Sequence, residues 1–216
     1  MNVLNKFGML ILTTSLLTAC GDSGNKGSSD KPAEQVAQSE SSSANKYEKA
    51  LSEFPEADPK LAEPIFISDK KSPEGLAELQ KFIHFTTSEE AQNIGKMGQE
   101  LQQLASQGKE AETLEQMKKL TDALEKFHQS ATALDIKDPE IKAVMDRTLQ
   151  VSSAANNLMI YAGKYSSELT IDGKDKDSLK FAKDFQEKSQ KLQETLRAAN
   201  QELQKAAEAL GKKYSQ

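Results

Sequence analysis

The sequence predicts an all-α protein whose body is an antiparallel up-down-up-down bundle of about four long helices, preceded by a disordered tether. Two observations carry this prediction. Apolar residues in the last two thirds of the 216-residue chain recur in alternating steps of three and four, and Pro139 is the only proline after Pro73. The breaks between the periodic stretches are short, which favours a chain that folds back on itself over the alternative of an extended intermolecular coiled coil.

Residues 1–19 are predicted to be a cleaved signal peptide. Lys6 precedes an apolar stretch of thirteen residues, Phe7 to Ala19, which reads FGMLILTTSLLTA. Because crossing the hydrocarbon core takes about 20 apolar residues, this stretch is too short for a permanent transmembrane anchor. We find no other transmembrane candidate in the sequence.

The signal peptide ends in Leu17, Thr18, Ala19 and Cys20. These residues resemble the lipobox of bacterial lipoproteins, in which small residues permit cleavage and the cysteine sulfur carries a diacylglycerol. The resemblance implies a covalent lipid on Cys20 that attaches the protein to a membrane of a Gram-negative envelope. Two alternatives stay open: a chance cysteine after an ordinary secretory signal, and a buried core cysteine. As the only cysteine, Cys20 excludes an internal disulfide and a four-cysteine zinc site.

The two residues after Cys20 bear on sorting. The resemblance implies that an aspartate directly after the cysteine retains a lipoprotein at the inner membrane. Here that position is Gly21, and Asp22 follows one residue later. We therefore expect the outer membrane, with the body in the periplasm or at the cell surface.

Residues 20–45 are predicted to be the lipidated cysteine and a disordered tether. The 25 residues from Gly21 to Asn45 contain seven serines and a single large aliphatic residue, Val36. Such a composition buries too little apolar surface to offset chain entropy. As a flexible coil, the tether would have a root-mean-square reach of about 28 Å.

Residues 46–72 are predicted to be a strap that prolines break into short pieces. The prolines are Pro55, Pro59 and Pro64. Tyr47, Leu51 and Phe54 have helical spacing, which predicts a two-turn helix before Pro55. The apolar segment 65–67 is expected to lie extended over the bundle. The alternative is an exposed patch for a partner.

Residues 73–216 are predicted to form the helical bundle. Ser72 before Pro73 is a good N-cap signal for a first helix that reaches about Gln107. Thr87 and Glu90 match a capping box, so this helix is expected to restart near Ser88 if the signal is used. The predicted seam is Ile83, Thr87, Glu90, Ile94, Met97, Leu101 and Leu104.

Three further helices follow. A second stripe of apolar residues begins after Gly108, Asp138 before Pro139 repeats the cap-then-proline signal for the third helix, and a fourth runs from about Ser178 to Tyr214. The predicted seams are Leu114, Met117, Leu120, Leu124, Phe127, Ala131 and Leu134; then Ile141, Val144, Thr148, Val151, Ala155, Leu158, Ala162, Tyr165 and Leu169; and finally Ala182, Phe185, Ser189, Leu192, Leu196, Ala199, Leu203, Ala206 and Leu210.

Charge and motifs limit the function classes. With 28 basic and 33 acidic residues, the chain has no basic excess for a general nucleic-acid binder. We find neither a nucleophile elbow nor a phosphate-binding loop, so an enzyme is not expected. The leading interpretation is a lipid-anchored, non-enzymatic interaction or accessory factor of the envelope, whose protein partner and oligomeric state the sequence leaves open.

A second hypothesis is a small-ligand, metal or haem sensor that uses His84 and His128. They are the only histidines, and each follows an apolar seam residue. If the chain turns back at Gly108, their heights differ by only about 6 Å, and helical bundles do hold metals and haem between facing helices. Because no paired Glu/His motif accompanies them, no cofactor is expected beyond the covalent lipid on Cys20.

Overall fold

The computed structural model describes residues 46–165 and 176–215. Every regular element within these ranges is helical, so the all-α prediction is confirmed. After a helical stretch at residues 46–52, the elements are the short 3-10 helix η3 (Pro59–Ala62), α2 (Gly75–Thr86), α3 (Glu89–Ser106), α4 (Glu110–Thr132), α5 (Pro139–Tyr165) and α6 (Lys176–Ser215). The predicted signal peptide and tether lie outside the described residues.

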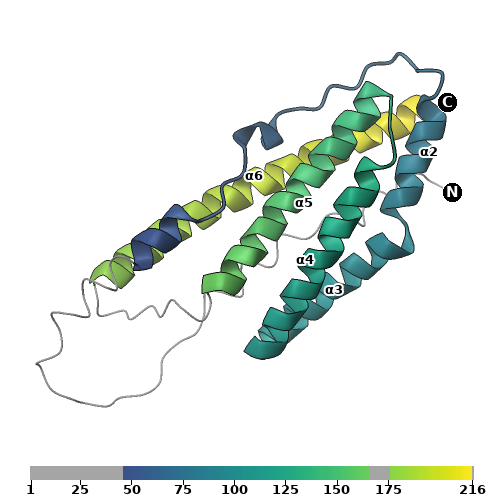
Figure 1. The fold of residues 1–216 in the computed structure, drawn as a ribbon. Helices are drawn as coiled ribbons and strands as arrows, with labels where there is room; N and C mark the ends of the chain where they lie inside the picture. The colour runs from purple at the N-terminus through teal and green to yellow at the C-terminus, as the bar shows by residue number, and fades with distance from the viewer. Residues whose placement is uncertain (1–45, 166–175, 216) are drawn as a thin grey trace, which may run out of the picture.

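Four of the helices pack in chain order, α3 on α4, α4 on α5 and α5 on α6, and each runs opposite to the one before it (Figure 1). The short helix α2 packs mainly against α5 and α6, near the C-terminus. The first of the four predicted long helices is therefore two helices with different neighbours. With 40 residues, α6 is about 60 Å long at 1.5 Å per residue, and the body is elongated along it.

The division between α2 and α3 follows from capping at Ser88. Its side chain accepts a hydrogen bond from the Ala91 amide at 3.2 Å, so the chain restarts its helix where the sequence indicated. The predicted cap, Thr87, has another role. Its hydroxyl donates to the Ile83 carbonyl of the preceding helix at 2.8 Å, which leaves Ser88 to cap the new one.

Two predicted helix starts have different outcomes. Asp138 caps α5 as predicted, since its Oδ1 accepts from the amides of Glu140 and Ile141 at 2.9 and 3.1 Å. Ser72 does not cap α2, which begins at Gly75. The Ser72 hydroxyl donates to Asp138 Oδ2 at 2.6 Å instead. The Ser72 side chain, which the local sequence predicted to be a helix cap, thus bonds to a residue distant in sequence.

The buried face of α2 is one residue out of register with the predicted seam. Leu79, Phe82 and Thr86 are buried, whereas the sequence placed Ile83 and Thr87 on the inner face. The physical reason is the identity of the neighbours. Because α2 packs mainly on α5 and α6, its buried side is set by those helices and not by a continuation into α3.

Residues 46–72, which we call the strap, lie along α5 and α6 with an inner and an outer side (Figure 1). Phe54 is buried among side chains of α5 and α6. Ile65 and Ile67 pack against apolar residues of α2, α5 and α6. Phe66 between them is 83% exposed. This alternation is that of extended chain, in which successive side chains point to opposite faces.

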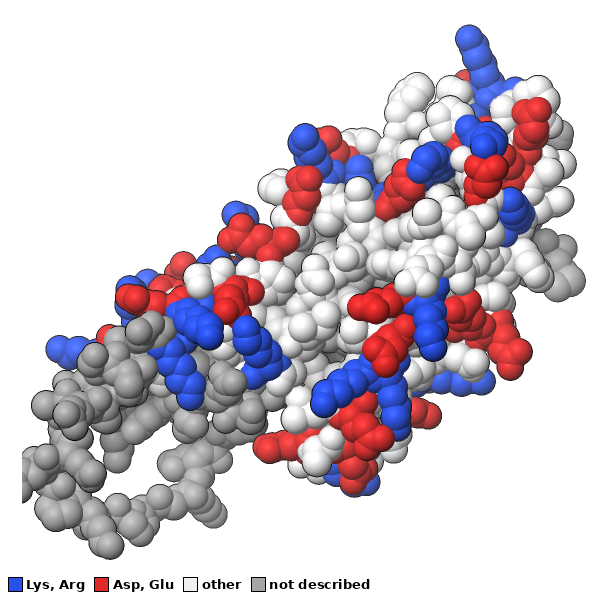
Figure 2. Space-filling view, viewed as in Figure 1, with Lys and Arg blue, Asp and Glu red and all other residues white. Residues whose placement is uncertain are grey.

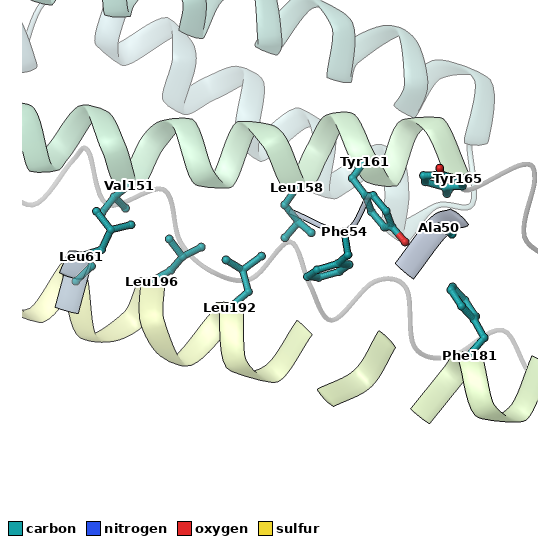
Figure 3. Close-up of a cluster of buried hydrophobic side chains, with 11 residues drawn as sticks. Ala50, Phe54, Leu61, Val151, Leu158, Tyr161, Tyr165, Phe181, Leu192 and Leu196 are labelled. Carbon is teal, nitrogen blue, oxygen red and sulfur yellow. The ribbon is translucent and has the colours of Figure 1, made fainter. Parts of the chain in front are cut away.

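The buried apolar side chains form three clusters along the body. The first joins the strap to α5 and α6, and Figure 3 shows its side chains pointing into the space between the helices; it contains Ala50, Phe54, Leu61, Val151, Leu158, Tyr161, Tyr165, Phe181, Leu192, Leu196 and Ala199. The second contains Leu79, Phe82, Ile136, Ile141, Val144, Met145, Ala206 and Leu210. The third, mainly between α3 and α4, contains Ala91, Ile94, Leu101, Leu120, Leu124, Phe127 and Met159.

Candidate functional site

The two histidines lie on different helices and differ in exposure. His84 is exposed on α2, and His128 is half-buried on α4. Their chain neighbours meet, because the rings of Phe85 and Phe127 stack with centroids 4.4 Å apart. The two helices therefore touch at this height, as the sequence argument required, but the contact is made by phenylalanines.

The half-buried His128 has an unusual environment. Its Nε2 is buried without a hydrogen-bond partner among the described residues. Burial lowers the pKa of its imidazole below the ordinary value, while the nearby Glu125 carboxylate acts in the opposite direction. Within the described parts of the chain, no group of three or more His, Cys, Asp and Glu side chains is placed to hold a metal ion.

The proposed lipidation and sorting residues, Cys20, Gly21 and Asp22, lie outside the described residues. Their roles therefore rest on the sequence resemblance. The described helices contain no segment that is long and apolar enough to span a bilayer.

A polar cluster lies where the strap, the start of α5 and the end of α6 meet. We call it the polar junction and define it as Ser68, Ser72, Glu78, Asp138, Glu140, Lys213 and Tyr214. Asp138 is its centre: besides capping α5, it accepts hydrogen bonds from the hydroxyls of Ser72 at 2.6 Å and Tyr214 at 3.1 Å. One carboxylate thus joins three segments of the chain.

A second carboxylate of the junction holds the strap and α6 to the start of α5. Glu140 Oε1 accepts from the amide and the hydroxyl of Ser68 at 3.0 and 2.7 Å. Its Oε2 accepts from Lys213 Nζ at 2.6 Å, and both side chains are largely shielded from solvent. Glu78 of α2 adds a third contact by accepting from the Lys137 and Asp138 amides.

The electrostatics of the junction favour ionised carboxylates. Burial by itself raises the pKa of Asp138, but hydrogen bonds from Ser72, two backbone amides and Tyr214 outweigh it and hold that pKa below its ordinary value. Burial also opposes ionisation of Glu140, whose pKa is lowered by Lys213 and by Ser68. A general acid at neutral pH needs a raised carboxyl pKa. The lowered pKa values of Asp138 and Glu140 instead fit a structural role, in which the two carboxylates hold segments of the chain together.

A tight backbone approach belongs to the same junction. A Cβ atom added at Gly75 would lie 1.9 Å from the Tyr214 hydroxyl and 2.6 Å from Ser72 Oγ. Sequence reasoning did not identify the junction, apart from the Asp138 cap. Tyr214 is far in sequence from Ser72 and Gly75, and no local pattern marks it as their neighbour.

The opposite end of the body is aromatic. Tyr47 of the strap stacks on Phe181 of α6, with ring centroids 5.0 Å apart. Phe54 meets the edge of Tyr161, with ring centroids 5.1 Å apart (Figure 3). The Tyr161 hydroxyl is buried with no hydrogen-bond partner among the described residues. Burial raises its pKa to about 12, so this phenol stays protonated.

The surface carries charges of both signs on the face shown in Figure 2. Four large apolar side chains are exposed among the described residues, and they lie toward the two ends of the body: Phe66, Leu76, Ile160 and Leu179.

Comparison with known protein families gives a match. A family model described as "Uncharacterised lipoprotein PM1805" matches residues 76–215, which run from the first turn of α2 to the end of α6. No curated protein and no solved structure matches the chain.

Proposed function

The chain belongs to the uncharacterised lipoprotein PM1805 family, and from that premise we propose that it is a lipid-anchored envelope protein whose helical body acts as a non-enzymatic interaction or accessory factor. The covalent lipid on Cys20 supplies the attachment. The sequence between Cys20 and the strap sets the distance that the body can extend from the membrane. The body provides the surface that contacts a protein partner.

The observation that carries this proposal is the agreement of two separate parts of the chain. The lipobox-like sequence occupies Leu17 to Cys20, whereas the family match covers residues 76–215. The two do not overlap, so neither indication depends on the other. Multiple acylation of the kind that the resemblance implies gives lasting attachment, because each buried methylene contributes about 0.8 kcal/mol.

The non-enzymatic role is supported by the hydrogen bonding of the polar junction. The carboxylates of Asp138 and Glu140 are engaged by hydrogen bonds from the chain itself, and both have lowered pKa values. The exposed apolar side chains Phe66 and Leu76 at the same end of the body are the surface that we assign to a partner.

Metabolic labelling with radioactive palmitate tests the attachment. The native chain should incorporate label and partition into the detergent phase, whereas a Cys20→Ala variant should do neither. A Ser23→Ala variant is the matched control, because it alters the same segment and leaves the sulfur intact. Persistent label in Cys20→Ala would contradict the proposal.

Membrane sorting requires a separate test. We propose the outer membrane, because Gly21 and not an aspartate follows Cys20. Density-gradient separation of the two membranes should place the native chain in the outer fraction and a Gly21→Asp variant in the inner one. Recovery of the native chain in the inner fraction would refute this assignment.

The second candidate, a metal or haem sensor, is favoured by one observation, the unpartnered Nε2 of His128. It predicts that zinc or haem raises the thermal unfolding temperature of the native chain but not of a His84→Ala/His128→Ala variant. If neither zinc nor haem changes the unfolding temperature of the native chain, the sensor hypothesis is excluded.

A further inference from the structure

The end of the body from which the chain leads back to Cys20 has a distinct surface. Residue 46 begins the described strap, and the adjacent Tyr47 stacks on Phe181 in the second turn of α6. The first turns of the strap and of α6 therefore lie side by side at this end (Figure 1). Only 25 residues separate it from Cys20.

Both segments carry lysines at this end. We call this surface the basic end and define it by five exposed lysines, Lys46, Lys49, Lys176, Lys180 and Lys183. Four acidic residues accompany them, Glu48, Asp177, Asp184 and Glu187. Basic side chains border the grey atoms at the lower left of Figure 2. The five lysines thus outnumber these four acidic residues by one, whereas the whole chain has a net charge of −5. The nearby Glu53 carboxylate is paired with Lys164 of α5.

These lysines are not used to hold the body together. Within the described residues, Lys183 alone among the five forms an ion pair, with Glu187 at 3.9 Å, and both of those side chains are largely exposed. Exposed pairs of this kind contribute little to stability. Lys176 and Lys180 also lie in the first turns of a helix, where the partial positive charge of the backbone disfavours cations.

An apolar side chain lies among these charges. Leu179 is 51% exposed and precedes Lys180 on the first turn of α6. A partly exposed leucine surrounded by lysines is the arrangement with which amphipathic helices meet anionic bilayers: the lysines lie near phosphate groups and the apolar chain enters the interface.

We propose that the basic end docks on the anionic lipid headgroups of the membrane that holds the Cys20 lipid. This inference rests on the proposed lipid anchorage. The predicted tether has a reach of about 28 Å, which keeps the basic end close to the bilayer. Docking then places the Phe66 and Leu76 end on the far side of the body, because α6 separates the two ends by about 60 Å.

A tryptophan reporter tests the contact, since the native chain contains no tryptophan. Full-length, lipidated Leu179→Trp protein is reconstituted into phosphatidylglycerol–phosphatidylcholine vesicles that contain brominated lipid. We expect a blue-shifted emission and quenching several-fold stronger than for Leu76→Trp. Leu76 is a matched control, because it is 48% exposed and lies at the opposite end.

Charge removal tests the cause. About fivefold in binding per lysine is expected near an anionic surface, so Lys176→Gln/Lys180→Gln/Lys183→Gln should lower the ratio of docked to undocked bodies about a hundredfold. The matched control is Lys60→Gln/Lys126→Gln/Lys212→Gln, which removes the same charge from exposed positions elsewhere. Raising the salt concentration should reduce the quenching in the native background.

The outcomes separate docking from anchorage. A chain that floats with the vesicles but shows equal quenching at positions 179 and 76, or equal quenching in vesicles of phosphatidylcholine alone, overturns the docking proposal and leaves the anchor intact. A chain that does not float with the vesicles overturns the anchor instead.

Discussion

Asp138 joins three parts of the chain that are distant in sequence. Its two oxygens accept four hydrogen bonds, two from the first turn of α5, one from the strap and one from α6. Asp138 as a residue is only 5% exposed. A buried ionised group is stable only when its lone pairs are satisfied. The Asp138 carboxylate therefore needs the hydrogen-bond donors of all three segments.

We predict that Asp138→Ala lowers the free energy of unfolding by about 2–3 kcal/mol, because it removes the α5 cap and takes their shared acceptor from the half-buried hydroxyls of Ser72 and Tyr214. Urea denaturation measures the change. Asp146→Ala is the control, since its exposed pair with Lys142 should change stability by about 0.5 kcal/mol or less. Equal losses would contradict the assigned role of Asp138.

The lowered carboxyl pKa values also predict acid sensitivity. A carboxyl group whose folded pKa lies below its unfolded pKa stabilises the fold above the unfolded value, about 4, and loses that contribution as pH falls through the folded pKa. Stability should therefore decline below about pH 4, and the decline should be shallower in Asp138→Asn. Urea titrations across this range check it, and an identical decline in the variant would count against a lowered Asp138 pKa.

Two glycines should respond in opposite directions. Gly75→Ala places a methyl group 1.9 Å from the Tyr214 hydroxyl, so we expect a loss of about 1–3 kcal/mol from overpacking. Gly95→Ala meets nothing within 4 Å and should stabilise α3 by up to about 1 kcal/mol through helix propensity. Thermal unfolding of both variants tests the pair, and a stabilised Gly75→Ala would show that the junction is looser than the structure indicates.

At the scale of elements, the strap is the segment whose packing follows least from the local spacing of apolar residues. Its prolines prevent a continuous helix. Buried, half-buried and exposed residues are interspersed along it. The Arg147 guanidinium of α5 donates to the Leu61 and Glu63 carbonyls. The chain around the end of η3 is thus held by a side chain of α5.

The two phenylalanines of the strap should differ in their effect on stability. Phe54→Ala removes a buried ring that contacts Tyr161 and Phe185, so we expect a loss of about 3–5 kcal/mol. Phe66→Ala removes an exposed ring and should change stability by about 0.5 kcal/mol or less. Denaturant midpoints measure both. A comparable loss at Phe66 would place that ring inside the body.

On the scale of the whole molecule, the three apolar clusters divide the body unequally. The α3–α4 pair has a cluster of its own, to which α5 contributes Met159. Its seam with α5 is partly polar, since Thr121 donates to Asn156 at 3.0 Å and the Ser152 hydroxyl is buried without a partner among the described residues. Such a seam stabilises less than an apolar one of the same area.

Amide hydrogen exchange should report this division. We expect the amides of α3 to exchange faster than those in the middle of α5 and α6, because local opening costs least where few buried contacts are broken. Mass spectrometry of peptic fragments at neutral pH resolves the helices. Protection in α3 equal to that in α6 would mean that the body opens as one unit.

The sequence by itself determined the helical class and several helix starts. Asp138 before Pro139 caps α5, and Ser88 opens α3, because capping joins residues only a few positions apart. The buried stripes of α4 and α6 also follow the predicted three-four spacing, with Leu120, Leu124 and Phe127 in α4. A helix that packs on neighbours along its length must show this period.

The tertiary structure alone decided the rest: the register of α2, the partner of Ser72, and the placement of the first turn of the strap beside that of α6. Each depends on residues that are distant along the chain but adjacent in space. Local periodicity indicates that a helix has an inner face, but it does not identify the neighbour against which that face packs. A hydroxyl such as that of Ser72 bonds to the strongest acceptor within reach, and only the packed body places Asp138 there.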